Sequence, residues 1–72
     1  MSHARIAIFN VTPAQRRQAY NLIRPHVAAA PPHRIAGKLS TPDYVRLNVD
    51  TWLADDAGRI IGWTDHKGLN HY

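Results

Sequence analysis

The chain contains no cysteine, no glutamate and no long apolar run. Without cysteine there is neither a disulfide framework nor a thiolate metal site. The longest uncharged stretch is well short of the roughly 20 apolar residues that a membrane-spanning helix needs. The opening residues MSHARIAIFN lack a charged segment followed by a long apolar stretch, so no secretory signal is expected. These absences predict a soluble, cytoplasmic protein with no membrane partner.

What the chain does have is enough apolar sequence for one small folded domain. Its 72 residues are 44% hydrophobic, which excludes a disordered tail and predicts a single domain spanning residues 1–72. Folding at this size buries only about 60% of the surface of the unfolded chain. Because so thin a core gains from added contacts, a homodimer is expected.

Positive charge dominates the polar residues. Nine Lys or Arg residues face five Asp residues, which gives a formal net charge of +4 and a pI near 10.1. Seven of the nine cations are arginines, whose planar guanidinium binds phosphate or guanine through two parallel hydrogen bonds. A polyanion, above all nucleic acid, is therefore the partner that the composition favours.

The first 30 residues predict a strand followed by a helix. ARIAIFN, residues 4–10, has β-branched residues and alternates Ile6, Ile8 and Asn10 with Arg5, Ala7 and Phe9; it is expected to be a short strand within an N-terminal arm, residues 1–11. Thr12, Pro13 and Gln15 then form a helix start, with a cap, a proline in the first turn and a capping-box glutamine. The expected helix covers residues 12–30, with a kink where Pro25 interrupts it.

Residues 34–53, RIAGKLSTPDYVRLNVDTWL, fit two incompatible structures. Val45, Val49 and Leu53 belong both to an alternating strand pattern and to the apolar stripe of a helix. Ser40, Thr41 and Pro42 repeat the cap-then-proline start, so a helix over residues 42–56, stopped at Gly58, is favoured. The alternative is a strand over residues 44–54 that turns at residues 55–58. A short helix over residues 33–39 and a terminal hairpin over residues 59–72 complete the prediction.

The order of these elements resembles a winged helix-turn-helix DNA-binding domain. IAGKLSTPDYVRLNVDTWLADDAGRII is similar to the family's short helix, turn, apolar helix face, glycine and strand. TPAQRRQAYNLIRPHV is similar to the first helix of the bacterial SOS repressor's DNA-binding domain and of similar small phage and plasmid regulators. The resemblance covers residues 12–72. It implies an α+β fold of three helices with a C-terminal β-hairpin wing and a short N-terminal strand.

The function implied by this resemblance is double-stranded DNA binding by a small transcriptional regulator. Its recognition helix, residues 42–56, would enter the major groove. The expected base contacts are Tyr44, Arg46, Leu47, Asn48 and Thr51. The expected phosphate contacts, from the supporting helices, the turn and the wing tip, are Arg16, Arg17, Arg34, Lys38, Thr41, His66 and Lys67.

A different partner is favoured by the charge of the expected recognition helix. Residues 42–56 carry four aspartates and one arginine, which would be repelled by the phosphates that line a groove. The alternative function is a non-enzymatic adaptor or inhibitor, as in phages, that binds a protein through this acidic helix, on the same scaffold or on a β-α-β-β fold.

Catalysis, metal binding and cofactors are not expected. The five histidines lack the HExxH spacing and the other close ligand spacings that favour metal coordination. Asp65 or His66 could meet His71 across the final hairpin, but no nucleophile or second carboxylate accompanies them at a recognisable spacing. No catalytic residue is therefore assigned.

Overall fold

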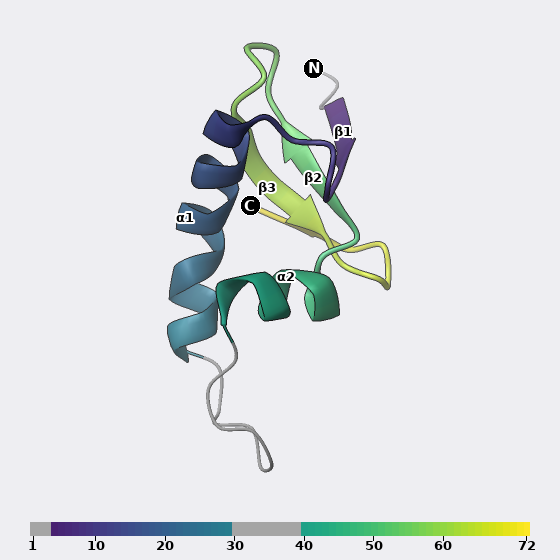
Figure 1. Ribbon diagram of the computed structural model, residues 1–72. Helices are drawn as coiled ribbons and strands as arrows, with labels where there is room; N and C mark the ends of the chain where they lie inside the picture. The colour runs from purple at the N-terminus through teal and green to yellow at the C-terminus, as the bar shows by residue number, and fades with distance from the viewer. Residues whose placement is uncertain (1–3, 30–39) are drawn as a thin grey trace.

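The computed structural model describes residues 4–29 and 40–72 (Figure 1), which form two helices and a four-stranded antiparallel sheet. The elements in chain order are β1 (Ala4–Ala7), α1 (Pro13–Ala29), α2 (Thr41–Asn48), β2 (Thr51–Ala54), β3 (Ile60–Thr64) and β4 (Asn70–His71). The strands lie in the sheet in sequence order, β1-β2-β3-β4. Neither described helix is both long enough and apolar enough to span a bilayer.

The winged helix-turn-helix architecture is wrong for this chain. The fold is α+β as expected, but the described residues contain two helices rather than three, and the expected wing is part of a larger sheet. The strands expected within residues 59–72 are β3 and β4, and β3 is bonded to β2 along its other edge. The short helix expected over residues 33–39 lies outside the described residues.

Helix α1 corresponds to the helix expected over residues 12–30, and its capping box is formed. The backbone N–H of Thr12 donates to Oε1 of Gln15 at 3.0 Å, and the N–H of Gln15 donates to Oγ1 of Thr12 at 3.1 Å. Pro25 lies inside the helix and deprives the carbonyl of Asn21 of its usual donor. Both residues are exposed, so water can satisfy that carbonyl.

The recognition helix expected over residues 42–56 is also wrong. Ser40 caps α2 through a 3.2 Å bond from the N–H of Asp43, and Pro42 lies in the first turn as expected. The helix ends at Asn48, and the backbone is already extended at Val49. Strand β2 then pairs with β1 on one side and β3 on the other. These two ladders satisfy the main chain of residues 51–54, and the strand buries Trp52, Leu53 and Ala54 together.

The core lies between the two helices and one face of the sheet. Ile23 of α1, Val49 at the end of α2 and Trp52 of β2 are its largest fully buried side chains. The cross-strand row of Ile6, Trp52 and Trp63 faces the helices, and neighbouring positions face the opposite side. Burying these rings fixes the register, since a one-residue shift would expose them.

Two turns of the same design join β2 to β3 and β3 to β4. In each, Oδ1 of an aspartate accepts the backbone N–H groups two and four residues later: Asp55 from Ala57 and Arg59, and Asp65 from Lys67 and Leu69. A glycine three residues after the aspartate has positive φ, 82° at Gly58 and 85° at Gly68. Residues 55–58 therefore form a turn between two strands, as the alternative to the long helix predicted. Gly58 does not end a helix.

Candidate functional site

Helix α1 presents a positively charged surface that we call the basic face of α1: Arg16, Arg17 and Arg24. All three are exposed, and the helix contains no acidic residue. Arg17 and Arg24 are seven residues apart, which places them two turns apart on the side away from the core, separated by about 10 Å. Among the described residues, no carboxylate pairs with any of the three.

The other cations are dispersed or neutralised. Arg46 of α2 forms an ion pair and hydrogen bond with Asp43 one turn earlier. Arg5 lies on β1, while Arg59 and Lys67 lie at the two turns of the sheet. Arg34 and Lys38, both expected to bind phosphate, lie outside the described residues. The basic face of α1 is therefore the main concentration of unpaired charge in the part of the chain that the structure describes.

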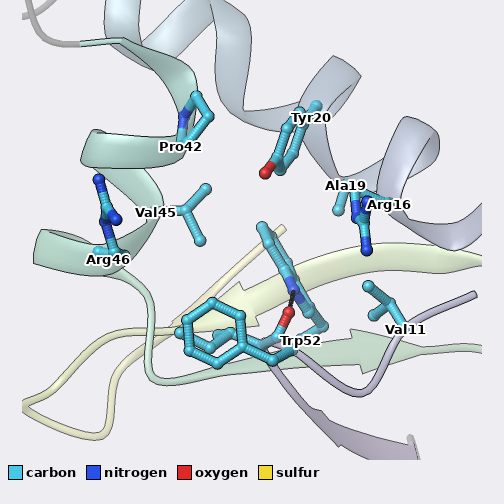
Figure 2. A pocket seen from close by; sticks show the side chains of 10 residues that line it. Val11, Arg16, Ala19, Tyr20, Pro42, Val45, Arg46 and Trp52 are labelled. Carbon is cyan, nitrogen blue, oxygen red and sulfur yellow. Dashed lines mark hydrogen bonds between the residues drawn. The ribbon is translucent and has the colours of Figure 1, made fainter. Parts of the chain in front are cut away.

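Beside this surface, a cavity of about 140 Å³ lies between α1, α2 and the segment after β1 (Figure 2). Its floor is the ring of Trp52, whose Nε1 donates to the carbonyl of Ile8 at 3.4 Å. The lining is mostly apolar, and consists of Ile8, Phe9, Val11, Arg16, Ala19, Tyr20, Pro42, Val45, Arg46 and Trp52. Phe9 is 80% exposed, an unusual position for so large an apolar side chain.

Two polar groups accompany this apolar lining. The hydroxyl end of Tyr20 points toward Val45 and Trp52, and the guanidinium of Arg16 lies on the side of Trp52 and Val11 (Figure 2). Arg46 stands on the opposite side with its guanidinium turned away from Trp52. No described residue forms a hydrogen bond with the Tyr20 hydroxyl. A concave apolar site with a few converging polar groups is typical of a ligand-binding pocket.

A second cavity, of about 160 Å³, is lined by His26, Tyr44, Asn48, Trp63, Asp65 and His71. His71 stacks on Trp63 with ring centroids 5.1 Å apart, and His26 meets the same ring edge-on at 4.8 Å. Nε2 of His71 lies 2.8 Å from Oδ2 of Asp65, so these two residues meet as the sequence allowed. His66 instead lies 3.8 Å from Asp50.

The second cavity lacks the remaining parts of a catalytic or metal site. No hydroxyl nucleophile lies among its lining residues apart from the phenol of Tyr44. No group of three or more potential metal ligands occurs within residues 4–29 and 40–72. The hydrogen bond from His71, with help from the backbone N–H groups of Leu69 and Lys67, lowers the pKa of Asp65. This arrangement stabilises the charged carboxylate and so supports the β3–β4 turn.

The five residues expected to contact bases do not share one helix face. Tyr44, Arg46, Leu47 and Asn48 belong to α2, whereas Thr51 belongs to β2, where its hydroxyl lies 2.7 Å from that of Thr64. Tyr44 is partly buried against the core, and Asn48 donates to its carbonyl at 3.1 Å. Of the five residues, Arg46 and Leu47 are exposed and the other three are partly buried.

The residues expected to contact phosphates lie in three places. Arg16 and Arg17 lie together on α1, Thr41 begins α2, and His66 and Lys67 lie in the β3–β4 turn. The sequence prediction gave no site role to Arg24 of α1, or to Phe9 and Tyr20, which line the cavity. Phe9 had a signal in the sequence, since the alternation of residues 4–10 places it on the side of Arg5 rather than that of Ile6 and Ile8.

Comparison with known proteins gives no relative for this chain: no family model, no curated protein and no solved structure matches it.

Proposed function

We propose that this protein is a non-enzymatic, cytoplasmic nucleic-acid-binding module that contacts the phosphate backbone through the basic face of α1. The observation that carries the proposal is the set of three exposed arginines on a helix without acidic residues. None of them is engaged by a carboxylate of the described residues, so their charge is available to a polyanion. The net charge of +4 supports the same partner.

Contacts of this kind give affinity rather than sequence selectivity. Phosphates are common to every sequence, and releasing their counterions makes binding fall steeply with salt. Double-stranded DNA, the partner expected from the sequence, is therefore the probe used in the test below. Regulating transcription would also require contacts to specific bases. Helix α2 has only eight residues, so another element would have to make these contacts.

The test compares variants that each remove one positive charge. We expect Arg17→Gln and Arg24→Gln each to weaken binding to a random-sequence duplex and to reduce the slope of log affinity against log salt by about 0.9. Arg59→Gln is the matched control, because it removes the same charge from the β2–β3 turn rather than from α1 or the cavity. Fluorescence anisotropy over a range of salt concentrations measures both quantities. Equal effects of all three variants, or binding that does not depend on salt, would refute a role for α1.

If the protein instead binds another protein, the contact surface in this fold differs from the acidic helix expected from the sequence. The aspartates expected on one acidic helix are dispersed: Asp43 lies in α2, Asp50 precedes β2, and Asp55 and Asp56 lie in the β2–β3 turn. What favours a protein partner is the outer edge of β1, which pairs with no other described strand. Such an edge accepts an added strand, including the β1 of a second copy. Sedimentation equilibrium over a range of concentrations tests for that dimer.

A further inference from the structure

We propose that the cavity between α1 and α2 binds one unpaired pyrimidine base of a single-stranded nucleic acid whose phosphates lie along the basic face of α1. This inference rests on the proposed function, because α1 supplies the phosphate contacts. It adds a site for the base, and it selects single strands over duplexes.

The size and lining of the cavity suit a single six-membered ring. Its volume of about 140 Å³ is close to the roughly 150 Å³ of an apolar cavity that admits benzene. Trp52, only 1% exposed, is fixed by the core and closes the bottom of the cavity, so the surface open to a ligand belongs mainly to the other lining residues. A thymine or uracil ring is the smaller kind of base and has the size of the single ring that such a cavity admits.

Phe9 provides an exposed aromatic ring at the cavity, on which an entering base can stack. It lines the cavity yet is 80% exposed, so its ring is free to stack against a planar group. Stacking on aromatic side chains beside a cationic surface is the common way in which proteins bind single strands. Arg16 lies between the two features, since it lines the cavity and belongs to the basic face of α1.

Tyr20 and Arg16 match the polar edge of a pyrimidine. The ring carries carbonyl oxygens that accept hydrogen bonds, and the Tyr20 hydroxyl points into the cavity without a partner among the described residues. The guanidinium of Arg16, on the side of Trp52, can donate to a second carbonyl or to the adjoining phosphate. A bound base would therefore be held on its faces by apolar contacts and on its edge by two donors.

The geometry disfavours paired bases. A base inside a duplex exposes only its groove edges, and it must leave the stack to be enclosed on both faces. The cavity is a recess between two helices and the sheet, so it accepts a ring but not the side of a duplex. Helix α2, which was expected to enter the major groove, has only eight residues.

The experiment measures binding of three fluorescent probes by anisotropy: ten-residue oligothymidylate, ten-residue oligoadenylate and a random duplex. Oligothymidylate should bind most tightly. Phe9→Ala should weaken its binding by about 10- to 100-fold, the usual loss for a stacked base. Tyr20→Phe, which keeps the ring and removes only the hydroxyl, should weaken it by about 3- to 10-fold. Leu69→Ala is the control, since Leu69 is also a large exposed apolar side chain, on the β3–β4 turn.

Each result distinguishes the base site from the phosphate surface. If Phe9→Ala and Tyr20→Phe bind oligothymidylate as the wild type does, the base site is refuted, while salt-dependent binding by α1 stands. If no probe binds at low salt, the proposed function fails. Titration with thymidine, which has no phosphate, then decides the cavity alone: shifts of the Trp52 indole resonance support the site, and unchanged resonances refute it. Concentration-dependent self-association lost in Phe9→Ala, without any change in oligothymidylate binding, would assign Phe9 to a dimer interface and overturn the proposal.

Discussion

Asp65 and His71 are joined across the β3–β4 turn by a 2.8 Å contact between Oδ2 and Nε2. The other carboxylate oxygen of Asp65 accepts the N–H groups of Lys67 and Leu69 at 2.9 and 3.0 Å. All of these bonds favour the charged carboxylate, and together they hold the pKa of Asp65 below its ordinary value of 3.8. One side chain thus links the turn, the last strand and the ring of Trp63 on which His71 stacks.

The first prediction concerns the stability of the fold at acidic pH. Because the pKa of Asp65 is lower in the folded state, its contribution to stability is fully present above pH 3.8 and is lost as the pH falls through the folded-state pKa. Asp65→Asn should therefore lower stability near neutral pH and make the loss of stability below pH 3.8 less steep. Urea denaturation between about pH 2 and pH 7 measures both effects.

A double-mutant cycle shows whether His71 is the partner responsible. His71→Gln should remove part of the same acid dependence, and the double variant should lose less than the sum of the single variants. Strict additivity would mean that the two side chains are near each other without stabilising each other.

A second prediction concerns the start of α2. Ser40→Ala removes the acceptor for the N–H of Asp43 and should cost about 0.5–2 kcal/mol. The Ser40 hydroxyl, with Arg46, also lowers the pKa of Asp43, so this pKa should rise toward 3.8 in the variant. Thermal denaturation and NMR titration measure the two changes. Ser40→Thr, which keeps a capping hydroxyl, should retain most of the stability.

A third prediction separates the two roles of Gln15. Its side chain closes the capping box with Thr12, and its Nε2 also donates to the carbonyl of Gly58 at 2.8 Å. Gln15→Glu keeps the acceptor for Thr12 but loses this donor, and should cost about 0.5–1.5 kcal/mol. Gln15→Ala loses both roles and should cost more. Urea denaturation at high salt, which screens the added charge, compares them; equal stability of Gln15→Glu and the wild type would deny the Gly58 bond any net effect.

The helix starts were predictable because their chemistry is local. Thr12 with Pro13, and Ser40 with Pro42, place a side-chain acceptor and a residue without an N–H where a first turn requires them. The end of α2 was not predictable in this way. Val45, Val49 and Leu53 fit both periods, and pairing of β2 with β1 and β3, distant in sequence, decides the outcome.

In the candidate site, too, the features that depend on local sequence were predictable and those that depend on distant segments were not. The exposure of Arg17 was predictable because it lies outside the apolar stripe of a helix whose start is well defined, whereas Arg16, seven residues before Ile23, lies beside that stripe and lines the cavity. The cavity could not be assigned, since it forms only when the segment after β1, the middle of α1, the first turns of α2 and Trp52 come together. Its shape depends on residues 51–54 forming a strand, and the sequence left a strand and a helix open there.

The last prediction uses Gly62 of β3, which lies beside the main chain of His71 in β4. A Cβ at this position would lie 2.2 Å from the carbonyl oxygen of His71 and 3.1 Å from the ring of Tyr72. The first obstacle is backbone, so β4 must move away rather than adjust a side chain. Gly62→Ala should cost about 1–3 kcal/mol and should separate His71 from both Trp63 and Asp65.

Gly68→Ala is the comparison that isolates this collision. Gly68 has positive φ but nothing within 4 Å of an added Cβ, so alanine there should cost only about 1 kcal/mol of backbone strain and leave β4 in place. Amide hydrogen exchange and chemical shifts of residues 69–72 distinguish the variants, because detachment of a two-residue edge strand exposes its amides without unfolding the core. If both variants show the same stability and unchanged shifts at His71, the close approach of β4 to Gly62 is not a constraint on this fold.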